Sequence, residues 1–296
     1  MTAIDANGIH IEYESLGDPG APAIVLIMGL GMQLIAWPDE FCRLLVERGF
    51  RVIRFDNRDA GLSTRIPWAK RPRLMLAMIA ARLRLPVRSP YSLDDMAADT
   101  LGLLDALGIA RAHVVGASMG GMIAQQLAAR HPERVRSLTS IMSTSGNPKV
   151  SKPTPAAART LVTRPENPAD QQAVIEHLMK TFGIIGSPGY PPSAEELRAR
   201  LTRSVQRAYY PAGVARQLLA VIAAGDRRRM LRAIKAPTLV IHGAADPLVP
   251  PSAGRDTAEN IAGSRLLMIE GMGHDLPPAL FGRITAAIAE HCAGAA

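Results

Sequence analysis

The segment from Ala112 to Arg130 constrains the fold of this chain more than any other part of its sequence. An apolar, β-prone run from Ala112 to Val115 enters Gly116-Ala117-Ser118-Met119-Gly120, and a helix-prone run from Met122 to Arg130 leaves it. The two glycines allow a sharp turn, because a Cβ atom at either position would collide with the strand or the helix. Such a turn strains the serine backbone and lifts its hydroxyl clear of the sheet. We therefore predict that Ser118 is a nucleophile between a strand and a helix.

Strand and helix signals alternate on both sides of this turn. Apolar runs and alternating patterns predict strands at 9–14, 23–28, 51–55, 112–115, 135–142, 238–241 and 264–269. Helical periodicity predicts helices at 41–48, 93–107, 122–130, 253–261 and 278–292. The first strand, 9–14, has the alternation of a half-exposed antiparallel edge strand. Together these signals indicate an α/β fold, with a mostly parallel central sheet covered by helices on both faces.

The middle of the chain has a different character, because the strand signals stop there. Nine prolines separate segments of helical periodicity between residues 145 and 225. The clearest of these segments are 169–182, 194–207 and 213–224. Recurring Leu, Ile, Val and Met residues favour packed helices over a disordered linker. We predict a helical cap, residues 145–225, inserted into an α/β core made of residues 1–144 and 226–296.

Composition excludes several classes of protein. With 296 residues, of which 48% are hydrophobic and 20% charged, the chain suits one large globular α/β domain with room for an insertion. No stretch approaches the roughly 20 apolar residues that span a bilayer, and Met1 to Asp5 lack the basic and apolar regions of a signal peptide. Cys42 and Cys292 share no ligand spacing with each other or with histidines. These features predict a cytoplasmic protein with two reduced thiols and no metal site.

The formal net charge of +8 raises the question of an anionic partner. The basic residues concentrate in 65–88 and 145–235 without interleaved aromatic residues, so we expect no nucleic-acid binding. An apolar segment, 74–85, is flanked by Lys70, Arg71, Arg73 and Arg88. A helix of this kind can lie on an anionic membrane surface, which predicts weak membrane contact through residues 70–88. The alternative is a helix that packs beside the cap and forms one wall of the pocket.

A serine hydroxyl needs a base that removes its proton, such as a histidine held by a carboxylate. Among seven histidines, only His274 lies in a loop directly after a late strand, within Gly271-Met272-Gly273-His274-Asp275. The flanking glycines leave room for its side chain to reach a substrate. We expect the other histidines on the surface (His10, His131, His177 and His291) or in structural positions beside strands (His113 and His242).

Asp246 is the best candidate for the carboxylate. It follows the predicted strand 238–241, and the carboxyl ends of parallel strands form the edge of the sheet at which sites assemble. The other suitable position, after strand 135–142, offers no acidic residue. The predicted triad is therefore Ser118, Asp246 and His274, in that order along the chain.

Acyl transfer also needs backbone N–H donors aimed at the oxyanion. The amide of Met119, the first residue of the predicted helix, supplies one. The second should come from the loop Met28-Gly29-Leu30-Gly31-Met32, in which Gly29 and its neighbouring glycine allow the chain to expose an amide. We assign this second donor to Leu30.

Three charged residues follow the predicted strand 51–55: Asp56, Arg58 and Asp59. Their place near the predicted site makes a catalytic role conceivable. The alternative is a structural role, in which their ion pairs and turn hydrogen bonds fix the loop.

Four motifs carry a resemblance to a known family: Met28-Gly29-Leu30-Gly31, Phe55-Asp56-Asn57-Arg58-Asp59-Ala60-Gly61-Leu62-Ser63, Gly116-Ala117-Ser118-Met119-Gly120-Gly121 and Gly273-His274. Over essentially its full length the sequence resembles the α/β-hydrolase superfamily, whose triads follow the chain order Ser, Asp, His. With Trp37-Pro38-Asp39-Glu40-Phe41, it is similar to the serine carboxylesterases and lipases near aclacinomycin methylesterase. One departure is Met28, where many members have a histidine, so the hydrogen bonds made by that histidine are lost.

The resemblance implies hydrolysis of a carboxylic ester without a metal or an organic cofactor. We expect Ser118 to attack the carbonyl while His274 takes its proton, and water to hydrolyse the acyl-enzyme. The apolar cap favours a largely apolar small-molecule ester. The same triad would serve a lactonase, a C–C hydrolase or a perhydrolase, and some proteins of this fold are non-catalytic ligand receptors. The sequence does not indicate an oligomeric state.

Overall fold

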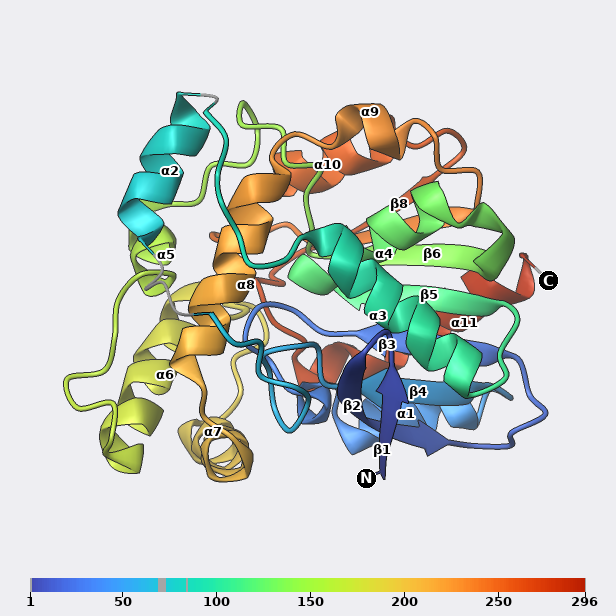
Figure 1. Cartoon of the computed structure of the whole chain (residues 1–296). Coiled ribbons are helices and arrows are strands. Elements are labelled where there is room, and N and C mark those ends of the chain that lie inside the picture. Colours follow the sequence, from blue (N-terminus) through green and yellow to red (C-terminus); the bar gives the residue numbers. More distant parts are fainter. Residues whose placement is uncertain (1, 69–72, 84, 296) are drawn as a thin grey trace.

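In this computed structural model, which describes residues 2–68, 73–83 and 85–295, eight strands form one central sheet (Figure 1). The strands are β1 (Thr2–Ala6), β2 (Ile9–Leu16), β3 (Ala23–Ile27), β4 (Arg51–Phe55), β5 (Ala112–Ala117), β6 (Val135–Ile141), β7 (Thr238–Gly243) and β8 (Arg265–Ile269). Their spatial order is β1-β2-β4-β3-β5-β6-β7-β8. β2 pairs antiparallel with β1 and β4, and every other pair is parallel. The parallel strands therefore end at one edge, and the predicted site residues follow four of them.

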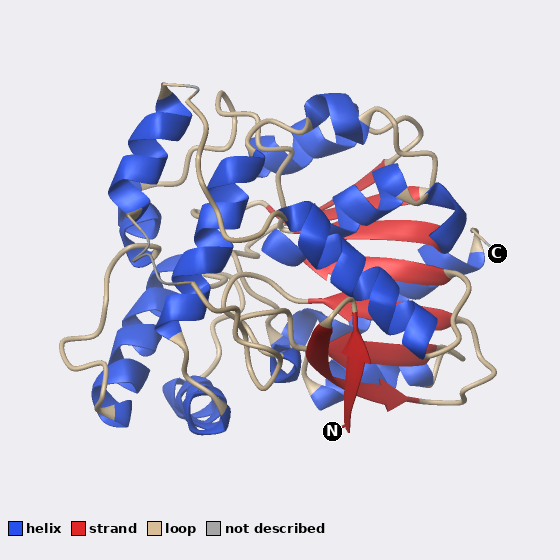
Figure 2. Ribbon diagram, viewed as in Figure 1, coloured by secondary structure: helices blue, strands red, loops and turns tan. Residues whose placement is uncertain are grey.

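Helices cover both faces of this sheet (Figure 2). One face carries α3 (Leu93–Ala106) and α4 (Met119–Arg130), and the other carries α1 (Asp39–Val46) and α11 (Phe281–Ala293). The core also contains α9 (Arg228–Leu231), α10 (Pro251–Glu259), η1 (Leu34–Ala36), η2 (Pro132–Arg134) and η3 (Pro278–Leu280). The predicted α/β fold with a mostly parallel sheet is confirmed.

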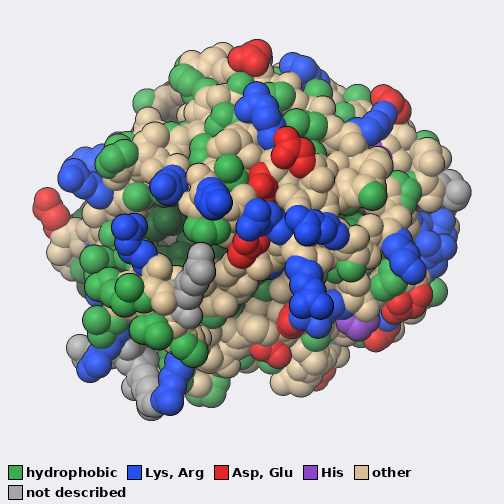
Figure 3. All heavy atoms as spheres, turned by 90° about the horizontal axis from the view of Figure 1, so that it is seen from above, with side chains coloured by type: hydrophobic (Ala, Val, Ile, Leu, Met, Phe, Trp, Pro, Cys, Tyr) green, Lys and Arg blue, Asp and Glu red, His purple; other side chains and the backbone are tan. Residues whose placement is uncertain are grey.

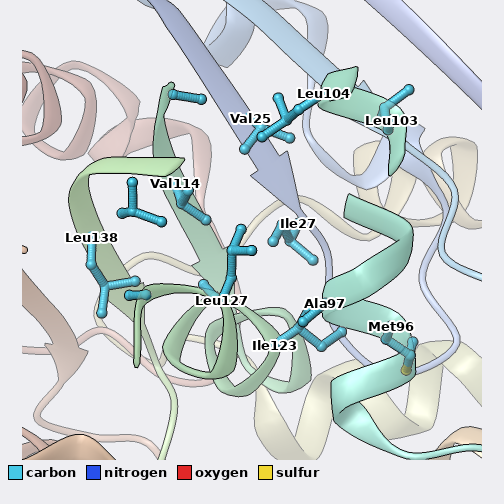
Figure 4. Close-up of a cluster of buried hydrophobic side chains, with 14 of the residues drawn as sticks. Val25, Ile27, Met96, Ala97, Leu103, Leu104, Val114, Ile123, Leu127 and Leu138 are labelled. Atoms are coloured by element: carbon cyan, nitrogen blue, oxygen red, sulfur yellow. The ribbon is translucent and has the colours of Figure 1, made fainter. Parts of the chain in front are cut away.

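Strand β3 illustrates why the sheet is covered on both faces. All five of its residues are buried, and successive side chains of a strand point to opposite sides. Val25 and Ile27 join a cluster with side chains of α3 and α4 (Figure 4). Ile24 and Leu26 join a second cluster, with side chains of α1 and α11, on the opposite face. The continuous apolar run of this strand thus reflects burial against two layers.

The prediction that residues 9–14 form an edge strand is wrong. β2 lies between β1 and β4, and β1 occupies the edge. Ile11 is fully buried while its neighbours in β2 are at least partly exposed, so the alternation reflects a sheet with one covered face. β1 has no sustained apolar pattern, and the sequence does not predict it.

Four further helices lie between β6 and β7 in the chain and beyond the carboxyl ends of the strands (Figure 1). They are α5 (Pro155–Thr160), α6 (Gln171–Ile185), α7 (Ala194–Arg207) and α8 (Pro211–Ala224). α7 begins with a capping box, in which Ser193 and Glu196 each bond to the backbone of the other. A separate hydrophobic cluster joins α6 to α7 and contains Val174, Ile175, Leu197, Leu201 and Val205.

Buried ion pairs tie these helices to the loop after β4. Arg207 of α7 donates from Nη1 to Asp56 at 2.7 Å. Arg216 of α8 makes two hydrogen bonds to Asp59, from Nε at 2.8 Å and from Nη2 at 2.7 Å. The hydroxyl of Tyr91 donates a third bond to Asp59 at 2.7 Å. Water and salt screen such buried charges poorly, so these pairs fix the position of the inserted helices on the sheet.

Helix α2 (Leu74–Arg82) lies apart from the main layers and packs against α8. Only Ala77 of this helix is buried, whereas Met75, Leu76 and Ile79 are each more than half exposed. The helix therefore contacts α8, yet most of its apolar side chains are exposed. The adjoining Lys70 and Arg71 fall outside the described residues. Of the helices in the described part of the chain, none is long and apolar enough to cross a membrane.

Arg216→Met tests the ion pair with Asp59. The substitution leaves the Asp59 carboxylate buried without its cation, so we expect the free energy of unfolding to fall by about 3 kcal/mol. The matched control is Arg130→Met, because Arg130 pairs with Asp94 in a largely exposed position and should contribute less than about 1 kcal/mol. Urea unfolding measures both changes. An equally small effect of the two substitutions would contradict the structural role of the buried pair.

Candidate active site

Ser118 occupies the turn that joins β5 to α4. Its backbone dihedral angles are φ 56° and ψ −119°, an unfavourable combination for a residue with a side chain. The amide of Ser118 donates to the carbonyl of Ile141 at 2.9 Å, and its carbonyl accepts from the hydroxyl of Ser143 at 2.8 Å. These bonds to the end of β6 hold the strained turn in place. Ser118 is partly exposed, so a substrate can reach it.

Three glycines allow other backbone segments to approach this serine closely. A Cβ atom at Gly120 would lie 2.0 Å from the carbonyl oxygen of Ile27, and one at Gly116 would lie 2.1 Å from the carbonyl oxygen of Gly120. Both contacts are with backbone atoms, which cannot rotate away. A Cβ atom at Gly29 would lie 3.1 Å from Cβ of Ser118. The end of β3, the serine and the start of α4 therefore meet only because these side chains are absent.

The side chain of His274 meets Ser118 from the loop after β8. Nε2 of His274 lies 3.0 Å from Oγ of Ser118. The end of α6 holds this loop, because the amide of His274 donates to the carbonyl of Ile185 at 2.7 Å. The amide of Gly273 donates to the hydroxyl of Ser187, just after α6, at 2.8 Å. The inserted helices therefore help to place the histidine.

Asp246, in the loop after β7, contacts the other ring nitrogen of this histidine. Nδ1 of His274 lies 2.7 Å from Oδ2 of Asp246, and Oδ1 accepts from the amides of Leu248 and Val249 at 2.9 and 2.8 Å. A carboxylate only accepts hydrogen bonds, so Nδ1 carries the proton and Nε2 is left to accept from the serine hydroxyl. Asp246 and His274 are only 3% and 8% exposed, so little water competes for these bonds.

The amides of Leu30 and Met119 lie on the two segments that meet at the serine. Met119 is the first residue of α4, where a helix leaves its amides without internal partners. Leu30 follows Gly29, where a Cβ atom would lie only 3.1 Å from Cβ of Ser118. Neither amide donates a hydrogen bond to any residue that the structure describes. Both are therefore available to an oxygen atom bound beside the serine.

The charged residues after β4 have partners that fix the loop. Asp56 accepts from the amides of Leu34 and Leu62 at 2.6 and 2.9 Å. Arg58 makes two hydrogen bonds of 2.6 Å to Asp99 of α3. Burial raises the pKa of Asp56 and of Asp99, and these partners oppose that shift. The contacts agree with a scaffold role rather than a catalytic one.

The prediction that His291 lies on the surface is wrong. Its Nε2 is buried 3.1 Å from the carbonyl oxygen of Leu138, because α11 packs against β6. His242 is also buried, with Nε2 2.8 Å from the carbonyl oxygen of Val249. Burial lowers the pKa of both rings, and it lowers that of His113 to about 4. These three histidines are therefore neutral structural residues at neutral pH.

Neither cysteine offers a competing nucleophile. Cys42 and Cys292 are both buried, and burial raises the pKa of their thiols to about 12 and about 11. Both thiols therefore stay protonated at neutral pH. Within the described ranges, no group of three or more His, Cys, Asp or Glu side chains could hold a metal ion.

The sequence does not single out two polar side chains that hold the loop carrying Leu30. Nδ2 of Asn57 donates to the carbonyl of Met28 at 2.9 Å. Oε1 of Gln217, in α8, accepts from the amide of Gly31 at 2.7 Å. Asn57 lies within a motif that does point to this region. Gln217 lies 186 residues from its partner in an ordinary helical pattern, so no local signal could reveal it.

A family model described as the alpha/beta hydrolase fold matches residues 22–277. The chain therefore belongs to the α/β hydrolase family, and the resemblance drawn from its motifs is confirmed.

Relatives of known activity cover almost the whole chain. Rhodomycin D methylesterase DnrP of Streptomyces peucetius is 32% identical over 96% of this chain and 95% of that protein. Rhodomycin D methylesterase DauP of Streptomyces sp. (strain C5) is 31% identical over 97% and 96%. Among solved structures, the enol-lactonase from Burkholderia xenovorans LB400 is similar with a TM-score of 0.72 and 25% identity, and the match covers 99% of this chain and 100% of that one.

Gly120→Ala tests the close approach of α4 to β3. The new Cβ atom would meet the carbonyl oxygen of Ile27, so we expect the free energy of unfolding to fall by at least about 2 kcal/mol. Gly183→Ala in α6 is the matched control, because open space surrounds that position and alanine should raise stability by about 0.5–1 kcal/mol. Thermal unfolding followed by circular dichroism measures both. A Gly120→Ala variant as stable as the wild type would show that the contact is not tight.

Proposed function

We propose that this chain hydrolyses carboxylic esters through an acyl intermediate on Ser118, with His274 as general base and acid and Asp246 as the residue that orients it. The observation that carries this proposal is the unbroken path of hydrogen bonds from Asp246, through both nitrogens of His274, to Oγ of Ser118. The predicted ester chemistry agrees with the two methylesterase relatives.

The reaction begins when Oγ of Ser118 attacks the ester carbonyl while Nε2 of His274 takes the hydroxyl proton. The buried carboxylate of Asp246 stabilises the imidazolium that forms. His274 then gives the proton to the leaving alcohol, and the acyl group stays on the serine. Water enters, the same nitrogen removes its proton, and attack on the acyl group releases the acid and restores the serine.

The intermediates of both steps carry negative charge on the former carbonyl oxygen. We assign its stabilisation to the amides of Leu30 and Met119, which have no other acceptor in the described part of the chain. The start of α4 adds the partial positive charge of a helix N-terminus. Gly29, Gly116 and Gly120 contribute by letting these amides approach the serine. Loss of one such donor typically lowers kcat by about 10²- to 10³-fold.

The substrate that we propose is the methyl ester of a largely apolar acid. The two relatives that match almost the whole chain at 31–32% identity are both named as rhodomycin D methylesterases. We assign recognition of the acid to residues 145–225, acting as a cap on the core formed by residues 1–144 and 226–296. Contacts of α6 with the histidine loop and of α8 with the Leu30 loop support this division.

Lactone hydrolysis is the second candidate, since the enol-lactonase structure shares 25% identity with this chain. A lactone is an ester whose alcohol stays attached to the acid, so every step above applies to it. A comparison of kcat/KM for a methyl ester and for a lactone of the same acid separates the two. The cytoplasmic location and the independence from metals and cofactors remain predictions.

Ser118→Ala tests the nucleophile. We expect kcat for p-nitrophenyl butyrate to fall by at least about 10⁴-fold, because no other group can form the acyl intermediate. A fluorophosphonate probe should label the wild type at Ser118 and leave the variant unlabelled. Ser252→Ala is the control, since that hydroxyl only donates to the carbonyl of Val150. Full turnover by Ser118→Ala, or labelling of a different serine, would contradict the assignment of Ser118 as the nucleophile.

We also propose that an anionic membrane surface binds the outward face of α2. Met75, Leu76 and Ile79 are exposed there, and no Asp or Glu occurs between residues 60 and 93. A groove of about 380 Å³ continues this surface and is lined by Arg73, Leu74, Met75, Leu76, Val162 and Arg164. Hydrophobic and basic side chains gather around a hollow on the left side of the view in Figure 3. Apolar side chains of such a surface can insert among the lipid headgroups, while neighbouring arginines attract the negative charge of acidic lipids.

Arg73→Glu combined with Arg82→Glu tests this surface. Each basic residue near an acidic bilayer contributes roughly 1 kcal/mol, so the double reversal should weaken binding to phosphatidylglycerol vesicles by at least about tenfold. Arg111→Glu combined with Arg283→Glu changes the net charge equally on other exposed elements and is the control. Vesicle flotation measures the bound fraction. Equal binding of the wild type to neutral and acidic vesicles would contradict the proposal that α2 binds an anionic membrane surface.

A further inference from the structure

Gln217 is a buried side chain that links a cap helix to two loops of the core. It lies on α8 and is 0% exposed. Its Oε1 accepts from the amide of Gly31 at 2.7 Å, and its Nε2 donates to the carbonyl of Arg58 at 2.7 Å. The orientation of the side-chain amide is unambiguous, because a backbone N–H only donates and a backbone carbonyl only accepts.

The loop that carries Leu30 is held on both sides of that residue. On one side, Asn57 donates to the carbonyl of Met28 at 2.9 Å. On the other, Gln217 binds the amide of Gly31. The amide of Leu30 lies between these two anchors and has no partner among the described residues. Its direction is therefore set by its neighbours rather than by a bond of its own.

Gly31 also has a backbone conformation that needs support. Its φ is 68°, and a Cβ atom there would lie 2.7 Å from Cγ2 of Val214, one turn before Gln217 on α8. The helix thus packs directly against the loop at this point. Met28 stands where many α/β hydrolases have a histidine, so the loop lacks the hydrogen bonds of that side chain. A bond supplied by α8 can fix the loop instead.

We propose that Gln217 is a positioning residue for ester hydrolysis: from the cap, it fixes the loop whose Leu30 amide binds the oxyanion. This inference rests on the proposed function. A preorganised donor stabilises the transition state only if it already points at the developing charge, and errors of about 0.5 Å reduce its effect. The same amide matters less for the neutral ester before attack. Loss of Gln217 should therefore lower kcat more than it changes KM.

Gln217→Met provides the test, because methionine keeps the length and packing of the side chain but forms neither hydrogen bond. We expect kcat for a p-nitrophenyl ester to fall by about 10- to 100-fold, less than for the loss of a whole donor, with KM changed by less than about threefold. The affinity for a trifluoromethyl ketone, which forms an oxyanion on Ser118, should fall by the same factor as kcat. Affinity for the corresponding methyl ketone should stay within about threefold.

A second variant, Gln217→Glu, tests the same inference if Gln217→Met does not fold. Glutamate keeps an oxygen that can accept from the Gly31 amide but loses the donor to Arg58, so it should retain more of the trifluoromethyl ketone affinity than methionine does. Gln125→Met is the matched control: Gln125 is equally buried, but its amide donates to Ser140. This control should lose stability while keeping kcat within about threefold.

Two results would overturn the inference. One is a folded Gln217→Met enzyme with wild-type kcat and trifluoromethyl ketone affinity. The other is an equal loss of affinity for both ketones, which would mean general damage to the pocket. Failure of the proposed function itself has a different signature, namely turnover that survives Ser118→Ala.

Discussion

The site depends on one close approach, that of the first turn of α4 to the end of β3. Because Gly120 has no Cβ atom, the helix begins against the carbonyl of Ile27 and brings Ser118 beside Gly29. This single contact places the serine hydroxyl, the amide of Met119 and the loop of Leu30 together. The positive φ of Ser118 is unfavourable, typically by about 1–3 kcal/mol. It persists because β5 is buried along its whole length and held by strands on both sides.

The inserted helices complete this arrangement. The end of α6 bonds to the backbone of His274 through the carbonyl of Ile185, and α8 bonds to the backbone of Gly31 through Gln217. Buried ion pairs from Arg207 of α7 and Arg216 of α8 hold these two helices on the loop after β4. A displacement of α6 or α8 would therefore move the loop of His274 or the loop of Leu30 with it. Under the function that we propose, substrate recognition by these helices is therefore linked to the geometry of the site.

The turn at Ser118 and the positions of Asp246 and His274 could be predicted because their signals are local or follow from topology. A few residues of strand, glycine and helix pattern define the turn. Loops after parallel strands reach the same edge of the sheet, so an acid and a histidine after late strands lie on the same edge as the serine. The pairs Gln217–Gly31 and Arg216–Asp59 join residues 186 and 157 positions apart. No periodicity links such partners.

The two wrong predictions also result from contacts between segments that are distant in sequence. Residues 9–14 look like an edge strand until β1 pairs beside them, and a histidine near the end of α11 looks exposed until that helix packs on β6. Burial depends on neighbours that are distant in sequence. For α2 the difference has the opposite sign. Its apolar composition suggests burial, but most of its apolar side chains are exposed in the described structure.

A covalent acyl group on Ser118 during turnover is the central claim. Rapid acid quenching during hydrolysis of p-nitrophenyl acetate, followed by proteolysis and mass spectrometry, measures it directly, because the fast leaving group makes deacylation the slow step. We predict an acetyl group on the peptide that contains Ser118, at about one per chain in the burst. Steady turnover with that peptide unmodified, or with the acetyl group on another residue, would contradict the mechanism.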